Sequence, residues 1–226
     1  MADLSHVLTP DFPVWPGFAP LQIDRIETYG ERGFAANALH VCEHTGTHID
    51  APVHFVDGAA AVDEIDATNL VASIAVIDIR EKAHHDADAV VTRADIERWE
   101  IAHGPIPGGA AVLMYSGWES RLADGARAYL NEDDAGVLHF PAFSGDAAEF
   151  LVRERSIKGI GVDTLSIDPG NAAKPVAHVA VLGAGCWALE NLANLRALPA
   201  CGATLIIGCA KFAGCTGAPA RCFAFW

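Results

Sequence analysis

The amino-acid sequence predicts a mixed α/β domain with a mixed sheet. Apolar stretches of strand length, such as residues 71–79 and 110–115, alternate with segments that begin with the helix-capping residues Thr92 and Ser144. Hydrophobic residues make up 51% of the 226 residues and charged residues 19%, which supplies a large core and excludes a disordered chain. This length suits one domain, and we expect a single domain over residues 1–226.

Other segments along the chain also have the pattern of a strand or a helix. The expected strands are 3–8, 21–26, 38–42, 71–79, 110–115, 158–163, 186–190, 204–208 and 218–225, and the expected helices are 92–100, 144–152 and 175–182. Alternation of apolar and polar residues in 21–26 indicates a half-buried strand. The order strand, helix, strand from 110 to 163 predicts a βαβ unit, with Asp163 and Asp168 in turns or caps after it.

The loop over residues 9–20 carries the first candidate binding residue. It contains four prolines, which exclude regular structure and stiffen the backbone. Its aromatic residue Trp15 either forms one wall of a pocket or fills the core beneath the loop, and composition alone leaves both possibilities open.

Charge and composition exclude several classes of partner. The net charge is -14, so a phosphate backbone would be repelled and nucleic acid is not an expected partner. Neither a signal peptide nor an apolar stretch of transmembrane length is visible, and we expect a cytoplasmic protein with no membrane partner. The six cysteines include no C-x-x-C pair and are expected to be buried thiols; Cys42, two residues before His44, is read as a thiol packed in a strand.

Residues 43–54 contain the densest group of candidate metal ligands. Three histidines and two carboxylates fall within these 12 residues, and imidazole and carboxylate are the usual ligands of zinc and related ions. Gly46 and Pro52 argue against one continuous helix, so a bent strand or loop is expected. A single histidine here would most simply be a solvated surface residue, but His44, His48, Asp50 and His54 together favour a metal site.

This stretch resembles the signature of the cyclase-like metal-dependent hydrolases, the group that contains bacterial kynurenine formamidases and isatin hydrolases. The pattern H-x-G-T-H-x-D-x-P-x-H is complete from His44 to His54. Residues 13–17 are similar to the P-x-W-P-G segment of the formamidases, whose Trp contacts the substrate. His178, followed twelve residues later by Glu190-Asn191-Leu192, matches a second feature of the family.

The resemblance implies a fold, a metal site and a mechanism. The fold would be a swivelling β/β/α arrangement. One metal would be held by His44, His48 and Asp50 and a second by Asp50, His178 and Glu190, with the two carboxylates bridging. Zinc fits this set and manganese fits it too, and one or two ions remain open. Divalent ions lower the pKa of bound water to about 7 and polarise a carbonyl.

The remaining histidine of the signature, His54, is expected to act as the general acid/base that protonates a departing amine. His40, four residues before His44, is read as a neighbour of the site and not as a ligand. A metal-binding module without turnover is the alternative of another class, and the presence of His54, which the ligand set does not need, speaks against it.

The expected substrate is small, flat and aromatic. Trp15 and Phe18 suggest this class, although the family often has Asp where this chain has Phe18. N-formylkynurenine, cleaved at its amide C–N bond to kynurenine and formate, is the first candidate; isatin or another cyclic amide or lactone is the alternative. We expect a homodimer, because 51% of the residues are hydrophobic in a chain of modest size and because the resemblance implies an oligomer.

Overall fold

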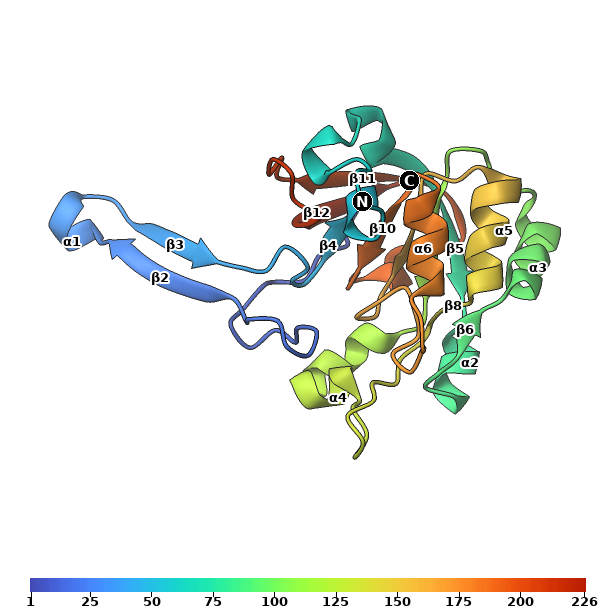
Figure 1. Cartoon of the computed structure of the whole chain (residues 1–226), viewed down its shortest axis with the longest axis horizontal. Helices are drawn as coiled ribbons and strands as arrows, with labels where there is room; N and C mark the ends of the chain where they lie inside the picture. Colours follow the sequence, from blue (N-terminus) through green and yellow to red (C-terminus); the bar gives the residue numbers. More distant parts are fainter.

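The computed structural model describes residues 1–226 as a β-barrel with helices on one side and a protruding hairpin (Figure 1). The strands are β1 (Ala2–Asp3), β2 (Gln22–Glu27), β3 (Ala36–His40), β4 (His48–Asp50), β5 (Val71–Asp78), β6 (Val90–Val91), β7 (Ala111–Tyr115), β8 (Ala142–Phe143), β9 (Gly159–Val162), β10 (Trp187–Glu190), β11 (Cys201–Cys209) and β12 (Gly217–Phe225). The α-helices are α1 (Tyr29–Arg32), α2 (Arg80–His85), α3 (Arg93–His103), α4 (Ala126–Leu130), α5 (Gly145–Arg155) and α6 (Val176–Gly183). Short 3₁₀ helices are η1 (Pro52–His54), η2 (Val62–Glu64), η3 (Ala67–Leu70), η4 (Trp118–Asp124) and η5 (Leu195–Ala197).

The main sheet closes on itself. Its strands run in the order β12-β11-β5-β7-β9-β10-β4, and β4 pairs again with β12, while β1 adds to the other end of β12. The strands β5, β7, β9 and β10 are parallel neighbours, and the remaining pairs are antiparallel. This arrangement confirms the predicted mixed α/β class and mixed sheet. The swivelling β/β/α label is not confirmed; the feature that defines this sheet is its closure.

Two apolar cores follow from the alternation of side chains along the strands. On β5, Ile74 and Val76 point into the barrel, whereas Ala75 and Ile77 point outward to the helices. The parallel strands are therefore buried on both faces, as their continuous apolar sequences predict. On β11, only alternate residues such as Leu205 and Ile207 are buried, because the outer face of the antiparallel strands meets solvent.

Helices α3, α5 and α6 lie side by side over the parallel half of the barrel (Figure 1). The predicted caps are confirmed: the side chain of Thr92 accepts a hydrogen bond from the backbone of Asp95 at the start of α3, and that of Ser144 accepts one from Ala147 at the start of α5. Because α5 connects the parallel neighbours β7 and β9, the predicted βαβ unit is also confirmed.

One sequence-based prediction is wrong in an instructive way. Residues 21–26 do form most of a strand, β2, but it is not half-buried. β2 and β3 form a two-stranded hairpin, capped by α1, that projects away from the barrel and is exposed on both faces (Figure 1). The apolar residues Ile23 and Ile26 of β2 therefore have no core of this chain to face.

The six cysteines are free thiols, but only Cys222 is buried; Cys201 is exposed and the other four are partly buried, so the expectation of buried thiols is wrong for five of them. Cys42 lies just after β3, outside the strand in which we placed it. No helix combines the length and apolar character needed to cross a bilayer. The cytoplasmic location stays a prediction.

Candidate metal centre and active-site cavity

Strands β4 and β10 present three candidate ligands on the outer face of the barrel wall. Ile49 points into the barrel core, so its neighbours His48 and Asp50 point outward. Glu190 pairs directly with His48 across the two antiparallel strands and therefore shares that face. The three side chains are almost completely buried, because α6 packs over this part of the wall.

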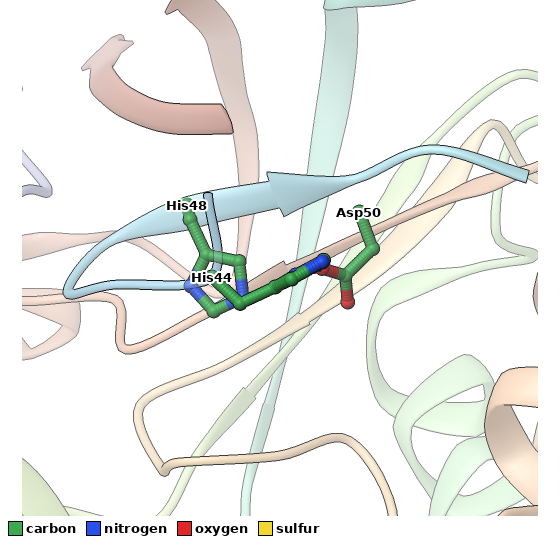
Figure 2. Close-up of side chains that lie close together, drawn as sticks. All are labelled: His44, His48 and Asp50. Carbon is green, nitrogen blue, oxygen red and sulfur yellow. The ribbon is translucent and has the colours of Figure 1, made fainter. Parts of the chain in front are cut away.

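A tight turn before β4 brings His44 back over the same site (Figure 2). Gly46 has a φ of +63°, and a Cβ at this position would collide with the side chain of Leu8. As a result, Nδ1 of His44 lies 2.7 Å from Oδ1 of Asp50. The chain therefore forms the predicted bent segment, and Gly46 is the residue that permits it.

Helix α6 supplies His178, and Asp168 holds it in place. The carboxylate of Asp168 accepts hydrogen bonds from the backbone N–H groups of Ala177 and His178 and from Nδ1 of His178, the last at 2.7 Å. Asp168 thus has the capping role that we predicted. It also orients a candidate ligand, a role the sequence analysis missed because no local pattern links a turn residue to a histidine ten positions later.

The five residues form two overlapping groups that share Asp50, namely His44, His48 and Asp50, and Asp50, His178 and Glu190; within each group the ligand atoms lie within 4.8 Å of one another. Nε2 of His48 is 3.3 Å from Oδ1 of Asp50 and 3.4 Å from Oε2 of Glu190. Nε2 of His178 is 3.4 Å from Oδ2 of Asp50 and 3.2 Å from Oε1 of Glu190. Both carboxylates therefore reach toward both groups.

The hydrogen bonds around the cluster leave lone pairs aimed at its centre. Nδ1 of His48 donates to the carbonyl of Gly46 at 2.7 Å, and Nδ1 of His178 donates to Asp168, so Nε2 of each ring faces the cluster. Nε2 of His48 and Oδ2 of Asp50 are buried and have no hydrogen-bond partner. Because an unpartnered buried polar atom is costly, these atoms fit a bound cation.

The charges of the cluster fit a divalent cation as well. Burial on its own lowers the pKa of His48, but the carboxylates of Asp50 and Glu190 outweigh it and raise that pKa to about 10. The pKa of Asp50 is held well below its usual value despite burial, chiefly by the charge of His48 and by the neighbouring imidazoles of His178 and His44. The two buried carboxylates thus require positive charge beside them, which a metal ion can supply in place of protons.

A cavity of about 350 Å³ opens onto the cluster. Its walls include the aromatic rings of Trp15, Phe18 and Phe55, together with the candidate ligands His178 and Glu190. The exposed fractions of Trp15 and Phe18, 38% and 41%, place both at the mouth and not in the core. Two possibilities were left open for Trp15, and in the structure it forms part of the pocket wall. The size of the cavity is in the range of small-molecule sites.

His54 lies in this cavity but outside both ligand groups. Its ring is stacked on His44, with centroids 4.0 Å apart, and meets Phe55 edge-on at 4.6 Å. Burial lowers the pKa of His54 to about 4, and the opposing effect of Asp50 is too small to restore it. The imidazole is therefore neutral at pH 7 and can accept a proton.

His40 and Cys42 are close to the signature in the sequence but lie outside the cluster, whereas Phe55 contributes to the site and was not predicted. His40 is on the exposed hairpin, 3.4 Å from Asp24, and belongs to neither ligand group. Cys42 is outside both groups too. Phe55, directly after the signature, is stacked on His178 with centroids 4.5 Å apart; only its position next to His54 could have suggested it.

The chain is similar to known proteins over most of its length. Residues 2–169 match the model of the Cyclase family, described as "Putative cyclase". The chain is 36% identical to an isatin hydrolase of Roseibium aggregatum, over 99% of this chain and 90% of that protein, and 28% identical to a kynurenine formamidase of Bacillus thuringiensis, over 84% and 80%. The solved structure of isatin hydrolase A from Labrenzia aggregata, bound to benzyl benzoate, superposes with a TM-score of 0.93 at 39% identity and covers 99% of this chain and 92% of that one. The chain therefore belongs to the Cyclase family, the family to which its signature from His44 to His54 pointed.

Proposed function

We propose that this protein is a metal-dependent hydrolase that opens the ring of an isatin-like cyclic amide. One observation carries the proposal: a buried cluster of three imidazoles and two carboxylates, with two unpartnered polar atoms, opens into a cavity walled by aromatic rings. The similarity to isatin hydrolase over nearly the whole chain supports the cyclic amide. Hydrolysis of an aryl formamide such as N-formylkynurenine is the second candidate, supported by the lower similarity to kynurenine formamidase.

In this proposal the metal is held by His44, His48, Asp50, His178 and Glu190. A divalent ion bound there would lower the pKa of water from 15.7 to about 7 and polarise the carbonyl under attack. Zinc is our first candidate and manganese the second, since the donor set suits both. The shared position of Asp50 in the two groups is compatible with one ion or with two.

The side chains of the cavity divide the remaining tasks. Trp15, Phe18 and Phe55 provide flat apolar walls for an aromatic ring and exclude water from it. His54 is neutral at pH 7, so it can take a proton from the attacking water. The imidazolium formed in this way then gives a proton to the nitrogen that leaves the carbonyl carbon. An anilide nitrogen needs this proton in order to depart.

The test combines metal analysis with a substrate panel. Elemental analysis should find one or two divalent ions per chain, which a chelator removes together with activity. Protein fully loaded with zinc or manganese is then assayed on isatin, N-formylkynurenine and an aryl lactone. We expect turnover of isatin to exceed the others in kcat/KM. Faster release of formate from N-formylkynurenine would favour the second candidate, and no turnover of any of them would favour a metal-binding module.

We also propose a homodimer that forms through the β2–β3 hairpin. A lone two-stranded hairpin is only marginally stable in water. Here Ile23 and Leu39 are paired across the two strands, yet their exposed fractions are 46% and 61%. In the proposed dimer, a second copy of the chain covers this exposed apolar surface of the hairpin. Two-fold symmetry then lets each hairpin contact the other subunit in the same way.

A further inference from the structure

We propose that Thr216, held by Glu43, is a positioning residue that sets which ring nitrogen of His44 faces the metal. The inference rests on the proposed metal site. His44 differs from the other two imidazoles of the cluster in one respect: its Nδ1 faces Asp50, whereas His48 and His178 turn Nε2 toward the centre. Something outside the cluster must therefore control the orientation and the tautomer of this ring.

Glu43 fixes Thr216 through both of its carboxylate oxygens. Oε1 accepts a hydrogen bond from the hydroxyl of Thr216 at 2.7 Å, and Oε2 accepts one from its backbone N–H at 2.9 Å. The hydroxyl has a single hydrogen, and a carboxylate can only accept. The hydrogen of Thr216 is therefore committed to Glu43, and the hydroxyl oxygen is left as an acceptor.

That acceptor lies 2.8 Å from Nε2 of His44. Since the hydroxyl accepts, Nε2 must donate and therefore carries a hydrogen. Nδ1 is then the nitrogen left for a metal: its hydrogen bond to Oδ1 of Asp50, at 2.7 Å, is the one that a cation held by Asp50 would replace. A hydrogen-bonded chain from Glu43 through Thr216 thus determines the tautomer in which His44 can bind a metal.

The packing of His44 supports the same role. A Cβ on Gly217 would lie 2.8 Å from Cε1 of His44 and 2.6 Å from the carbonyl of Ile49. The ring therefore fits against the backbone of residues 216–217 because glycine is there. His54 is stacked on His44 as well. By orienting the ring of His44, Thr216 therefore also orients the surface on which His54 packs.

The test measures zinc affinity by competition with a chromogenic chelator. Thr216→Val keeps the shape of the side chain and removes the acceptor, and loss of such an outer hydrogen bond weakens metal binding roughly 10–100-fold. Thr216→Ser retains the hydroxyl, so its zinc affinity should stay within about threefold of wild type, a smaller change than the loss expected for Thr216→Val. Thr204→Val, on the exposed face of β11, is the matched control and should leave affinity unchanged.

A second measurement does not depend on any variant. In zinc-loaded wild-type protein with ¹⁵N-labelled histidines, the His44 ring should show a proton on Nε2 and none on Nδ1. Glu43→Gln should lower zinc affinity, because the amide can donate to Thr216 and release its hydroxyl hydrogen toward Nε2. Equal affinity of wild type and Thr216→Val, or a proton on Nδ1 of His44, would overturn this inference while leaving the proposed function intact. Wild-type protein that binds no zinc or manganese would overturn both.

Discussion

The imidazole of His54 is stacked on that of His44, with an interplanar angle of 27°, yet only His44 belongs to a ligand group. Two histidines in contact therefore have different chemical surroundings. His44 contacts the buried carboxylate of Asp50, whereas His54 has no hydrogen bond to either buried carboxylate and meets Phe55 in the cavity. This difference allows the binding of metal and the transfer of protons to be separated by mutation.

His54→Ala should retain the metal and lose turnover. The five candidate ligands are untouched, and general acid–base groups typically contribute about 10²–10⁴-fold to the rate. Metal content by elemental analysis and kcat on an anilide substrate check the two halves of the prediction. The defect should shrink on activated aryl esters, whose leaving groups need less protonation. An empty metal site in this variant would make His54 a ligand instead.

His48→Ala should lose metal and activity together. Nε2 of His48 is buried without a partner and faces both carboxylates, so the variant loses a ligand from the centre of the cluster. Elemental analysis of the purified variant should find less metal than in wild type under the same zinc concentration. His40→Ala is the matched control, because His40 lies on the exposed hairpin, and it should retain full metal content.

Trp15→Ala should weaken the binding of aromatic substrates without affecting the metal. Aromatic stacking contributes about 0.5–1.5 kcal/mol beyond the burial of area, which corresponds to a roughly two- to tenfold increase in KM. Steady-state kinetics on isatin measure this change. Trp226→Ala removes an exposed tryptophan that does not line the cavity and should behave as wild type. An unaltered KM for Trp15→Ala would place the substrate elsewhere.

Disruption of the hairpin should produce monomers. Aspartate at both positions of the cross-strand pair Ile23 and Leu39 places charge on the surface proposed to be buried between subunits. Light scattering should give about twice 23.8 kDa for wild type and a value near 23.8 kDa for the double variant. Ile101→Asp, at a residue with an exposed fraction of 88% on α3, is the control. A wild-type mass near 23.8 kDa at every concentration would refute the dimer.

Asp95 should make stability depend on pH in the acid range. Burial raises the pKa of its carboxyl, but hydrogen bonds from Lys82 and Thr92 outweigh this effect and lower the pKa to about 2. A lowered pKa stabilises the fold above the unfolded value of 3.8, and this contribution disappears as the pH falls through 2. It amounts to about 1 kcal/mol, because the Lys82 ammonium is partly exposed and screened.

Urea unfolding of wild type and Asp95→Asn between pH 7 and pH 2 measures that contribution. The difference in the free energy of unfolding between the two proteins should be largest above pH 4 and should shrink toward pH 2. The exposed residue Asp134, changed to Asn, provides the control. A difference that stays constant with pH would mean that Asp95 acts only through the shape of the cap.

The local sequence was sufficient for the elements whose signals are short in range. Thr92 and Asp95 form the capping box of α3 because their side chains and backbone are three residues apart. The continuous apolar run of β5 predicts a strand buried on both faces, since one face meets the barrel interior and the other the helices. The ligands His44, His48 and Asp50 were recognisable for the same reason, because one turn at Gly46 brings them together.

Long-range pairing decided the features that neither a local signal nor the family resemblance encodes. Alternation in residues 21–26 specifies a strand with two different faces, but nothing in those residues says whether this chain or another covers the apolar one. Closure of the barrel depends on β4 meeting β12, which are more than 160 residues apart in the sequence. The same contact carries Thr216 to His44 and Gly217 to Asp50. Hydrogen bonds of this kind depend on ångström-scale placement of distant segments, which only the folded chain determines.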